Sequence, residues 1–204
     1  MSVPDQIASH QLGALLEALG SDAPTPGGGA AAAIAGAAGV AAAEKVLRLT
    51  IGKPAHAAHD DEHTARLGRL MRARSMFLVL ADEDAEGFAA LRALWSLPKD
   101  DPRRRAAWDG AVRGAIAPPR ATLALCADVA RDLEGMVGTT SRLLRADLGV
   151  GATLVRAAAR AAAWNVRVNI AMLPEPERAP LEAETERVLG AATRSTGAAE
   201  EGCA

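Results

Sequence analysis

The residues best suited to chemistry lie between Leu80 and Phe88, in the stretch Leu-Ala-Asp-Glu-Asp-Ala-Glu-Gly-Phe. Helical periodicity from about residue 62 to 95 predicts one long helix around this stretch. A seven-residue spacing places Asp84 in an otherwise apolar row, whereas Asp82 falls about 200° away around the helix. The apolar members of that row are Leu70, Phe77 and Leu91. We therefore expect Asp84 to face the core and Asp82 to face solvent.

Two interpretations of Asp84 follow from this position. A carboxylate on an apolar face costs stability unless it is paired, hydrogen-bonded or protonated. Asp84 could be a general acid or base with a raised pKa, because such acids cluster at functional sites. It could equally be a structural acid that is paired by Arg74 or another basic residue.

A second candidate site is the glycine-rich start of a helix expected at about residues 27 to 49. Thr25 suits the N-cap and Pro26 the first helical position. Gly27, Gly28 and Gly29 then leave backbone N–H groups uncovered, and such a helix end attracts anions. The alternative is that these glycines only allow a tight turn and a close helix crossing.

The remaining polar candidates each have a structural alternative. Lys53 follows Gly52 in a short loop, so it could contact an anion or simply be exposed. Asn165 and Asn169 are four residues apart on one helix face, so they could bind a ligand or a neighbouring backbone. Asp147 suits the start of a helix. His59 and His63 are one turn apart, but the spacing provides no further metal ligand, so no metal site is predicted.

The elements that must position these residues are all helical. No stretch alternates with a period of two, and six to eight helical segments separated by Pro/Gly turns predict an all-α bundle. We expect Pro118 and Pro119 to interrupt or kink one helix. Residues 1–189 are interpreted as a single domain, and the small, polar segment 190–204 as disordered.

Composition excludes several classes of function. The net charge is −2, and no basic face is interleaved with aromatic residues, so nucleic-acid binding is not expected. Cys126 and Cys203 belong to no metal or disulfide motif. The longest apolar run, Ala30 to Ala43, falls short of the ~20 residues that span a bilayer. Met1 to His10 show no signal-peptide pattern, so we expect a cytoplasmic protein with no membrane contact.

Several stretches taken together resemble the cyclodeaminase/cyclohydrolase family. They are Pro24–Gly29, Leu49–Lys53, Asp82–Phe88 with Leu97–Lys99, and Asp147–Val150 with Asn165–Asn169. The family includes the C-terminal domain of formimidoyltransferase-cyclodeaminase and stand-alone methenyltetrahydrofolate cyclohydrolases. The resemblance covers about residues 10 to 175.

The resemblance implies an up-and-down antiparallel helical bundle that forms a homodimer and binds a folate. Members either close 5-formiminotetrahydrofolate to 5,10-methenyltetrahydrofolate with loss of ammonia, or open methenyltetrahydrofolate with water to 10-formyltetrahydrofolate. The tetrahydrofolate derivative is the substrate and no cofactor is implied. A formimidoyltransferase would be a natural partner for the first reaction.

The resemblance also assigns roles to particular residues. The family's catalytic aspartate matches Asp84. Lys53, Lys99 and the helix start at Gly27 to Gly29 are candidates to receive the carboxylates of the folate's glutamate. Asp147, Asn165 and Asn169 are the remaining candidates for substrate binding.

One segment departs from the family pattern. Members commonly have Gly-Asn-x-Asn-x-x-Ser-Asp before the last core helix, whereas this chain has Thr140-Ser-Arg-Leu-Leu-Arg-Ala-Asp147. The aspartate is retained, but both asparagines and the serine are lost. An alternative function is therefore a non-catalytic member that uses the same pocket for another small ligand or a partner protein.

Overall fold

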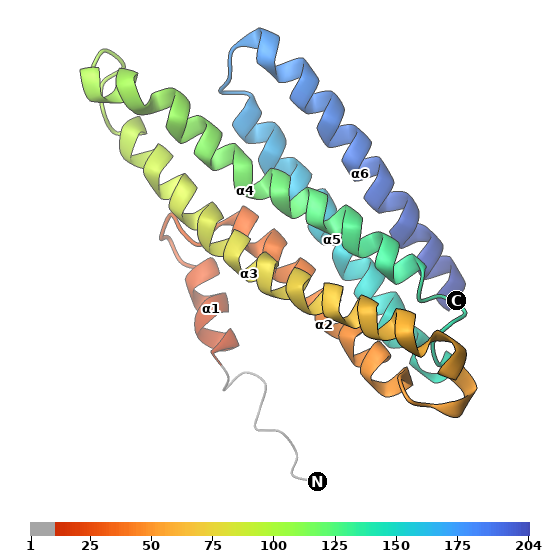
Figure 1. Cartoon of the computed structure of the whole chain (residues 1–204). Coiled ribbons are helices and arrows are strands. Elements are labelled where there is room, and N and C mark those ends of the chain that lie inside the picture. Colours follow the sequence, from red (N-terminus) through yellow and green to blue (C-terminus); the bar gives the residue numbers. More distant parts are fainter. Residues whose placement is uncertain (1–10) are drawn as a thin grey trace.

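The computed structural model describes residues 11–204, and within that range the chain forms helices and no strands (Figure 1). The helices are α1 (Leu12–Leu19), α2 (Gly28–Thr50), η2 (Pro54–His59), α3 (Asp60–Trp95), α4 (Pro102–Glu134), η3 (Arg142–Leu144), α5 (Arg145–Ile170) and α6 (Glu175–Cys203). The predicted all-α class is confirmed. The expectations for residues 1–10 lie outside the described part of the chain.

The long helices form an up-and-down antiparallel bundle. Each of α2 to α5 packs against the next helix in the chain, and α2 also packs against α5, which closes a four-helix arrangement. The last helix, α6, lies against α4 and α5 (Figure 1). This topology follows from short connections, because they make consecutive helices antiparallel neighbours.

Small residues let the helices of the core approach one another closely. A Cβ atom added to Gly39 of α2 would lie 2.8 Å from the carbonyl oxygen of Gly151 in α5. A Cβ atom on Gly36 would lie 2.8 Å from the ring of Phe77, which is fully buried. Neither distance is compatible with a side chain, so α2 packs directly against its neighbours through its glycines.

Two prolines lie inside α4 without dividing it, so of the expected interruption or kink the interruption is wrong. The helix continues from Pro102 to Glu134 with Pro118 and Pro119 buried inside it. A proline removes one backbone N–H and strains the preceding turn, but its fixed φ angle is compatible with a helix. Packing of α4 against α3, α5 and α6 holds the helix together.

The expected disorder of residues 190–204 is also wrong. The helix α6 extends from Glu175 to Cys203 and takes in nearly all of this segment. Ala192, Thr196 and Ala199 are buried, and their spacing of four and three residues places them on one helix face. These small side chains are only weakly hydrophobic, yet together they form a stripe that packs on the bundle.

The helix α2 is apolar and packs against α3 and α5. Within the described chain it meets the length and hydropathy expected of a membrane span, with a mean hydropathy of 1.5 over its most apolar window. However, 61% of that window is buried inside the bundle. The expectation that this apolar segment is too short to span a bilayer is therefore not met by the whole helix, although most of its apolar window packs inside the bundle.

Candidate active site

Asp84 lies where the apolar stripe of α3 meets the first turn of α2. Leu70, Phe77 and Leu91 are fully buried, and Asp84 is half-buried in the same row. Asp82 is exposed. The assignment of an inward Asp84 and an outward Asp82 is therefore confirmed.

Arg74 does not pair with Asp84. Its Nε atom donates to Oε1 of Glu44 at 2.8 Å. Glu44 lies in the second half of α2, away from the glycine-rich start. Within residues 11–204, no charged group contributes to the pKa of Asp84. The interpretation of Asp84 as half of an ion pair with Arg74 is thus wrong.

The glycine-rich start of α2 lies directly against the Asp84 carboxylate. A Cβ atom on Gly29 would lie only 2.0 Å from Asp84 Oδ1 and 2.3 Å from Cγ. The helix begins at Gly28, so the uncovered N–H groups of its first turn face this acid. The anion expected at this helix end is therefore, at least in part, the protein's own carboxylate.

Burial raises the pKa of the Asp84 carboxyl, while the backbone N–H of Ala30 lowers it in part. The net shift is upward from the ordinary value of 3.8, because removal from water disfavours the charged form. A carboxyl with a raised pKa exchanges a proton more readily near neutral pH than an exposed one. Asp84 is accordingly equipped to act as a general acid or base.

Two amides complete the polar lining of the site from α5. Asn165 Nδ2 donates to the carbonyl oxygen of Ala161 at 2.9 Å, and Asn169 Nδ2 donates to that of Ala115 at 2.7 Å. Both side chains also line the cavity at Asp84. Each NH₂ group therefore donates to a backbone carbonyl, and within residues 11–204 neither side-chain oxygen accepts a hydrogen bond.

The two prolines of α4 explain the position of Asn169. The carbonyl oxygen of Ala115 would normally accept a hydrogen bond from the residue four positions later, which is Pro119 and has no N–H. Asn169 supplies the missing donor. The proline pair thus fixes one amide of the site rather than breaking the helix.

We expect Asn169→Leu to lower the free energy of unfolding by about 1–3 kcal/mol, because the carbonyl of Ala115 loses its donor. In a Pro119→Ala background the residue at 119 regains an N–H, and the same substitution should cost clearly less. Urea denaturation of the four variants measures this coupling. Equal costs in both backgrounds would contradict the role assigned to the proline.

These residues surround a cavity of about 160 Å³. Its lining comprises Pro24, Thr25, Gly27, Gly28, Gly29, Asp84, Phe88, Ala115, Asn165, Val168 and Asn169. Cavities that hold a whole drug-sized ligand are typically ~300–1,000 Å³. This cavity can hold one ring of a larger ligand, and the remainder of such a ligand would extend beyond it.

Three predicted residues lie elsewhere. Lys53 follows the far end of α2, which is 23 residues long, or about 35 Å from the glycine-rich start. Asp147 lies near the same far end, where it pairs with Lys45 at 3.1 Å. It occupies the first turn of α5, which begins at Arg145, rather than the N-cap position. Lys99 lies in the turn between α3 and α4.

The segment that departs from the family pattern is also distant from Asp84. The backbone N–H of Ser141 donates to Thr50 Oγ1 at the far end of α2, and Leu143 is 93% exposed. Residues 140–146 therefore do not line the Asp84 cavity of their own chain. Their divergence leaves the geometry around Asp84 intact.

Sequence reasoning missed several residues that line the cavity. Phe88 lies one turn after Asp84, and its place on an apolar heptad row suggested packing rather than a site. Ala115 and Val168 carry no chemical signal of their own. For Ala115 a signal did exist, because Pro119 four residues later marks an unpaired carbonyl.

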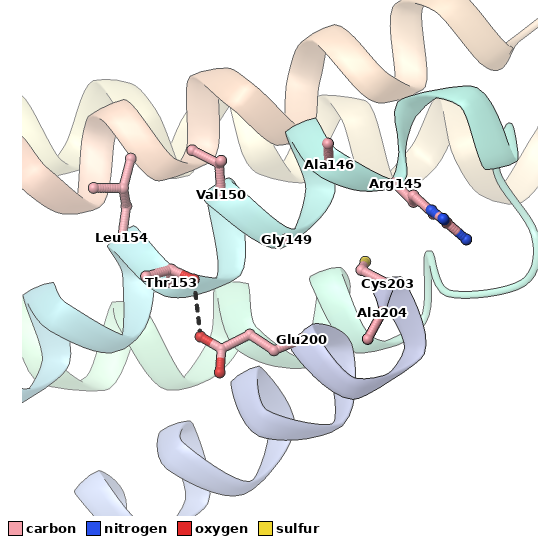
Figure 2. Close-up of a pocket in the computed structure, with 9 residues that line it drawn as sticks. All are labelled: Arg145, Ala146, Gly149, Val150, Thr153, Leu154, Glu200, Cys203 and Ala204. Atoms are coloured by element: carbon pink, nitrogen blue, oxygen red, sulfur yellow. Dashed lines mark hydrogen bonds between the residues drawn. The ribbon is translucent and has the colours of Figure 1, made fainter.

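A larger hollow of about 520 Å³ lies at the other end of α5 (Figure 2). Its acid, Glu200, accepts hydrogen bonds from Thr153 at 3.0 Å and Arg156 at 2.6 Å. The rest of its lining is mostly small or apolar. Because Glu200 already accepts these two hydrogen bonds, it is less suited to proton transfer than Asp84 in the smaller cavity.

His63 is buried on α3, and its Nε2 atom lies 3.1 Å from Thr139 Oγ1. The His59 and His63 rings are 5.7 Å apart and tilted. Across the residues that the structure describes, no three His, Cys, Asp or Glu side chains form a cluster suited to a metal.

Comparison with known proteins yields a consistent set of relatives. Residues 11–187 match the formiminotransferase-cyclodeaminase family. A methenyltetrahydrofolate cyclohydrolase from Methylorubrum extorquens is 35% identical over 159 residues, which cover 76% of both chains. A formimidoyltransferase-cyclodeaminase from Sus scrofa is 32% identical over 173 residues, which cover 82% of this chain and 32% of that protein.

The fold has a solved counterpart as well. A formiminotetrahydrofolate cyclodeaminase from Thermotoga maritima superimposes with a TM-score of 0.82 at 21% identity, covering 97% of this chain and 96% of the other. The sequence match spans most of the chain, and the helical architecture agrees with it. The chain therefore belongs to the formiminotransferase-cyclodeaminase family.

Proposed function

We propose that this protein is a folate-dependent one-carbon enzyme in which Asp84 transfers a proton. The observation that carries the proposal is a half-buried carboxyl with a raised pKa, held against a helix N-terminus in a cavity and without an ion-pair partner among residues 11–204. Membership of a family whose named relatives act on tetrahydrofolate adducts supplies the substrate class.

Hydrolysis of methenyltetrahydrofolate is the reaction we put first. Water adds to the carbon between N5 and N10, and Asp84 takes a proton from that water. The C–N5 bond then breaks as the added hydroxyl becomes the formyl carbonyl. N5 receives the proton from Asp84, the hydroxyl proton is released to solvent, and 10-formyltetrahydrofolate leaves. The cyclohydrolase relative supports this choice, because the match covers 76% of both chains.

Cyclodeamination is the second candidate, and the solved structure with the same fold supports it. In that reaction N10 attacks the formimino carbon, Asp84 takes the N10 proton, and the departing amine receives a proton as ammonia leaves. The substrate would then be supplied by a formimidoyltransferase on another domain or protein. The matched region is only 32% of the two-function relative from Sus scrofa.

Two assays on the same preparation separate these reactions. Loss of methenyltetrahydrofolate is followed by absorbance, and release of ammonia from 5-formiminotetrahydrofolate by a coupled assay. Turnover in the first assay alone identifies a cyclohydrolase, and turnover in the second a cyclodeaminase. Turnover in neither would overturn the proposal. Within one chain, segment 140–146 lies away from Asp84, so its divergence does not alter the acid itself.

We also propose that the protein is a homodimer formed through an exposed apolar stripe on α5. The stripe runs at alternating spacings of four and three residues and consists of Val150, Leu154, Ala157, Ala161, Trp164 and Val168. Val150, Trp164 and Val168 are 55%, 65% and 66% exposed. Such a row is typical of a helix that packs on a partner.

A twofold axis across this stripe would place the two ends of α5 opposite each other in the dimer. The Asp84 cavity lies at one end of the stripe, because Val168 lines it. Lys53 and Asp147 lie near the other end. The partner's copies of these residues would then lie near the cavity, which explains why the predicted residues are divided between two ends of one chain.

We expect the wild-type protein to sediment as a dimer at micromolar concentration and Trp164→Glu to sediment as a monomer, because a charge in a packed interface is costly. Leu143→Glu is the matched control, since Leu143 is exposed but lies off the stripe. A monomeric wild type, or a dimeric Trp164→Glu variant, would count against this interface. If Lys53 acts across the interface, mixing the inactive Asp84→Asn and Lys53→Gln proteins should restore activity. A mixed dimer then contains one site with both wild-type residues.

A further inference from the structure

A second hollow, separate from the Asp84 cavity, lies at the turn between α3 and α4. It has a volume of about 390 Å³ and is lined by Lys99, Arg104, Arg105 and Trp108. Both helices continue past the start of α2 to reach this turn (Figure 1). The hollow therefore lies beyond the Asp84 cavity along the same pair of helices.

The charges of this hollow are available to a ligand. In residues 11–204, Asp101 pairs with Arg103, whereas Lys99, Arg104 and Arg105 form no ion pair. Arg104 is held in place, because its Nη1 atom donates to the carbonyl oxygen of Leu97 at 2.7 Å. Its Cζ atom also lies 4.5 Å from the centre of the Trp108 ring.

The same charges are unfavourable for the helix that carries them. Arg104 and Arg105 occupy the first turn of α4, which contains no acidic residue. Cations at a helix N-terminus oppose the helix macrodipole. The N-cap residue Asp101 offsets this in part, because its side chain accepts a hydrogen bond from the backbone N–H of Arg103. Arginines that destabilise the start of their own helix are expected where the protein has to bind an anion.

A row of aromatic rings connects the two hollows. Phe88 lines the Asp84 cavity, and its ring lies edge-on to Trp95 with centroids 6.2 Å apart. The Trp95 ring is in turn 6.3 Å from Trp108, which lines the cationic hollow. Trp95 is 45% exposed, so a flat group can lie against this row from solvent.

We propose that Lys99, Arg104 and Arg105 bind the glutamate carboxylates of the folate substrate, with its p-aminobenzoyl ring lying along Trp95. The inference rests on the proposed function for the identity of the substrate. The small cavity at Asp84 holds only the reacting ring of such a ligand, so the remainder must extend outward. The row of rings from Phe88 to Trp108 extends from the Asp84 cavity to the cationic hollow, so the p-aminobenzoylglutamate part of the ligand can lie along it.

The first test compares methenyltetrahydrofolate with the corresponding tetrahydropteroate, which lacks the glutamate. For the glutamate-containing substrate, the double variant Lys99→Gln/Arg105→Gln should raise KM about tenfold or more, with kcat within about twofold, because charged hydrogen bonds are lost. For the substrate without glutamate, KM should not change. Arg187→Gln, an exposed substitution on α6, is the control. An equal change for both substrates would overturn the assignment.

The second test does not depend on turnover. Binding of p-aminobenzoylglutamate and of p-aminobenzoate is measured by quenching of tryptophan fluorescence. The wild type should bind the glutamate-containing compound about tenfold more tightly, and the double variant should bind both alike. Equal binding by the wild type would overturn the subsite. Preferential binding without turnover of methenyltetrahydrofolate would instead refute the proposed reaction and leave the subsite standing.

Discussion

Replacing Asp84 by asparagine is expected to lower kcat for methenyltetrahydrofolate by about 10²-fold or more, because the amide can neither take a proton from water nor give one to N5. The raised pKa of Asp84 should also appear in the wild-type pH profile. We expect kcat/KM to fall with decreasing pH along a limb whose midpoint lies above the ordinary value of 3.8. Absorbance assays across pH, with wild type and Asp84→Asn, measure both effects.

The control for this experiment is Asp82→Asn, because Asp82 is exposed on the same helix two residues earlier. It should retain the wild-type rate within about twofold, as expected of a surface substitution away from the site. Equal rates for wild type and Asp84→Asn would show that Asp84 does not transfer the proton, whatever the protein's substrate.

Loss of activity in Asp84→Asn should not result from unfolding. The folded protein binds the Asp84 proton more tightly than the unfolded chain, because the pKa is raised from 3.8. This contribution to stability is present below pH 3.8 and is lost as the pH rises through the folded-state pKa. At neutral pH the ionised acid opposes folding, so neutral asparagine should leave the free energy of unfolding unchanged or higher. Urea denaturation at pH 7 tests the sign.

Gly29→Ala is expected to reduce kcat/KM by about 10²-fold, because a misplacement of about 1 Å at a catalytic group can cost that much. The added Cβ atom would lie 2.0 Å from Asp84 Oδ1, so the carboxylate or the start of α2 has to move. Either movement separates the acid from the helix N-terminus. Steady-state kinetics, with a melting curve on the same sample, measures the effect.

Gly28→Ala changes the neighbouring glycine, which also lines the cavity. Its added Cβ atom would lie 3.6 Å from Asn165 Oδ1, an ordinary van der Waals contact, so Asp84 does not have to move. We expect a smaller loss of kcat/KM than in Gly29→Ala, because the methyl group takes up cavity space but leaves the acid in place. Comparable losses in the two variants would mean that the whole glycine-rich turn, rather than contact of Gly29 with the acid, matters for catalysis.

Much of the bundle could be predicted from periodicity alone. Helix α3 was expected from about residue 62 to 95 and extends from Asp60 to Trp95, because apolar residues repeat along its length. The helix α2 was expected from about residue 27 and begins at Gly28. The prediction that Thr25 caps it was wrong, because the N-cap is Gly27 and no side chain caps the helix. The end of α6 could not be predicted, because the buried face of residues 190–204 consists of Ala and Thr, which carry little hydrophobic signal.

By itself, the sequence determined the helical class and the direction in which Asp84 points, because both depend on spacing within one helix. Only the tertiary structure decided what Asp84 meets: the backbone of Gly29 from α2 and the amides of α5. It also placed Lys53 and Asp147 at the far end of the bundle and joined Lys99 to two arginines of α4. Helical periodicity specifies which face is buried, whereas contacts between distant segments depend on how the helices pack against one another.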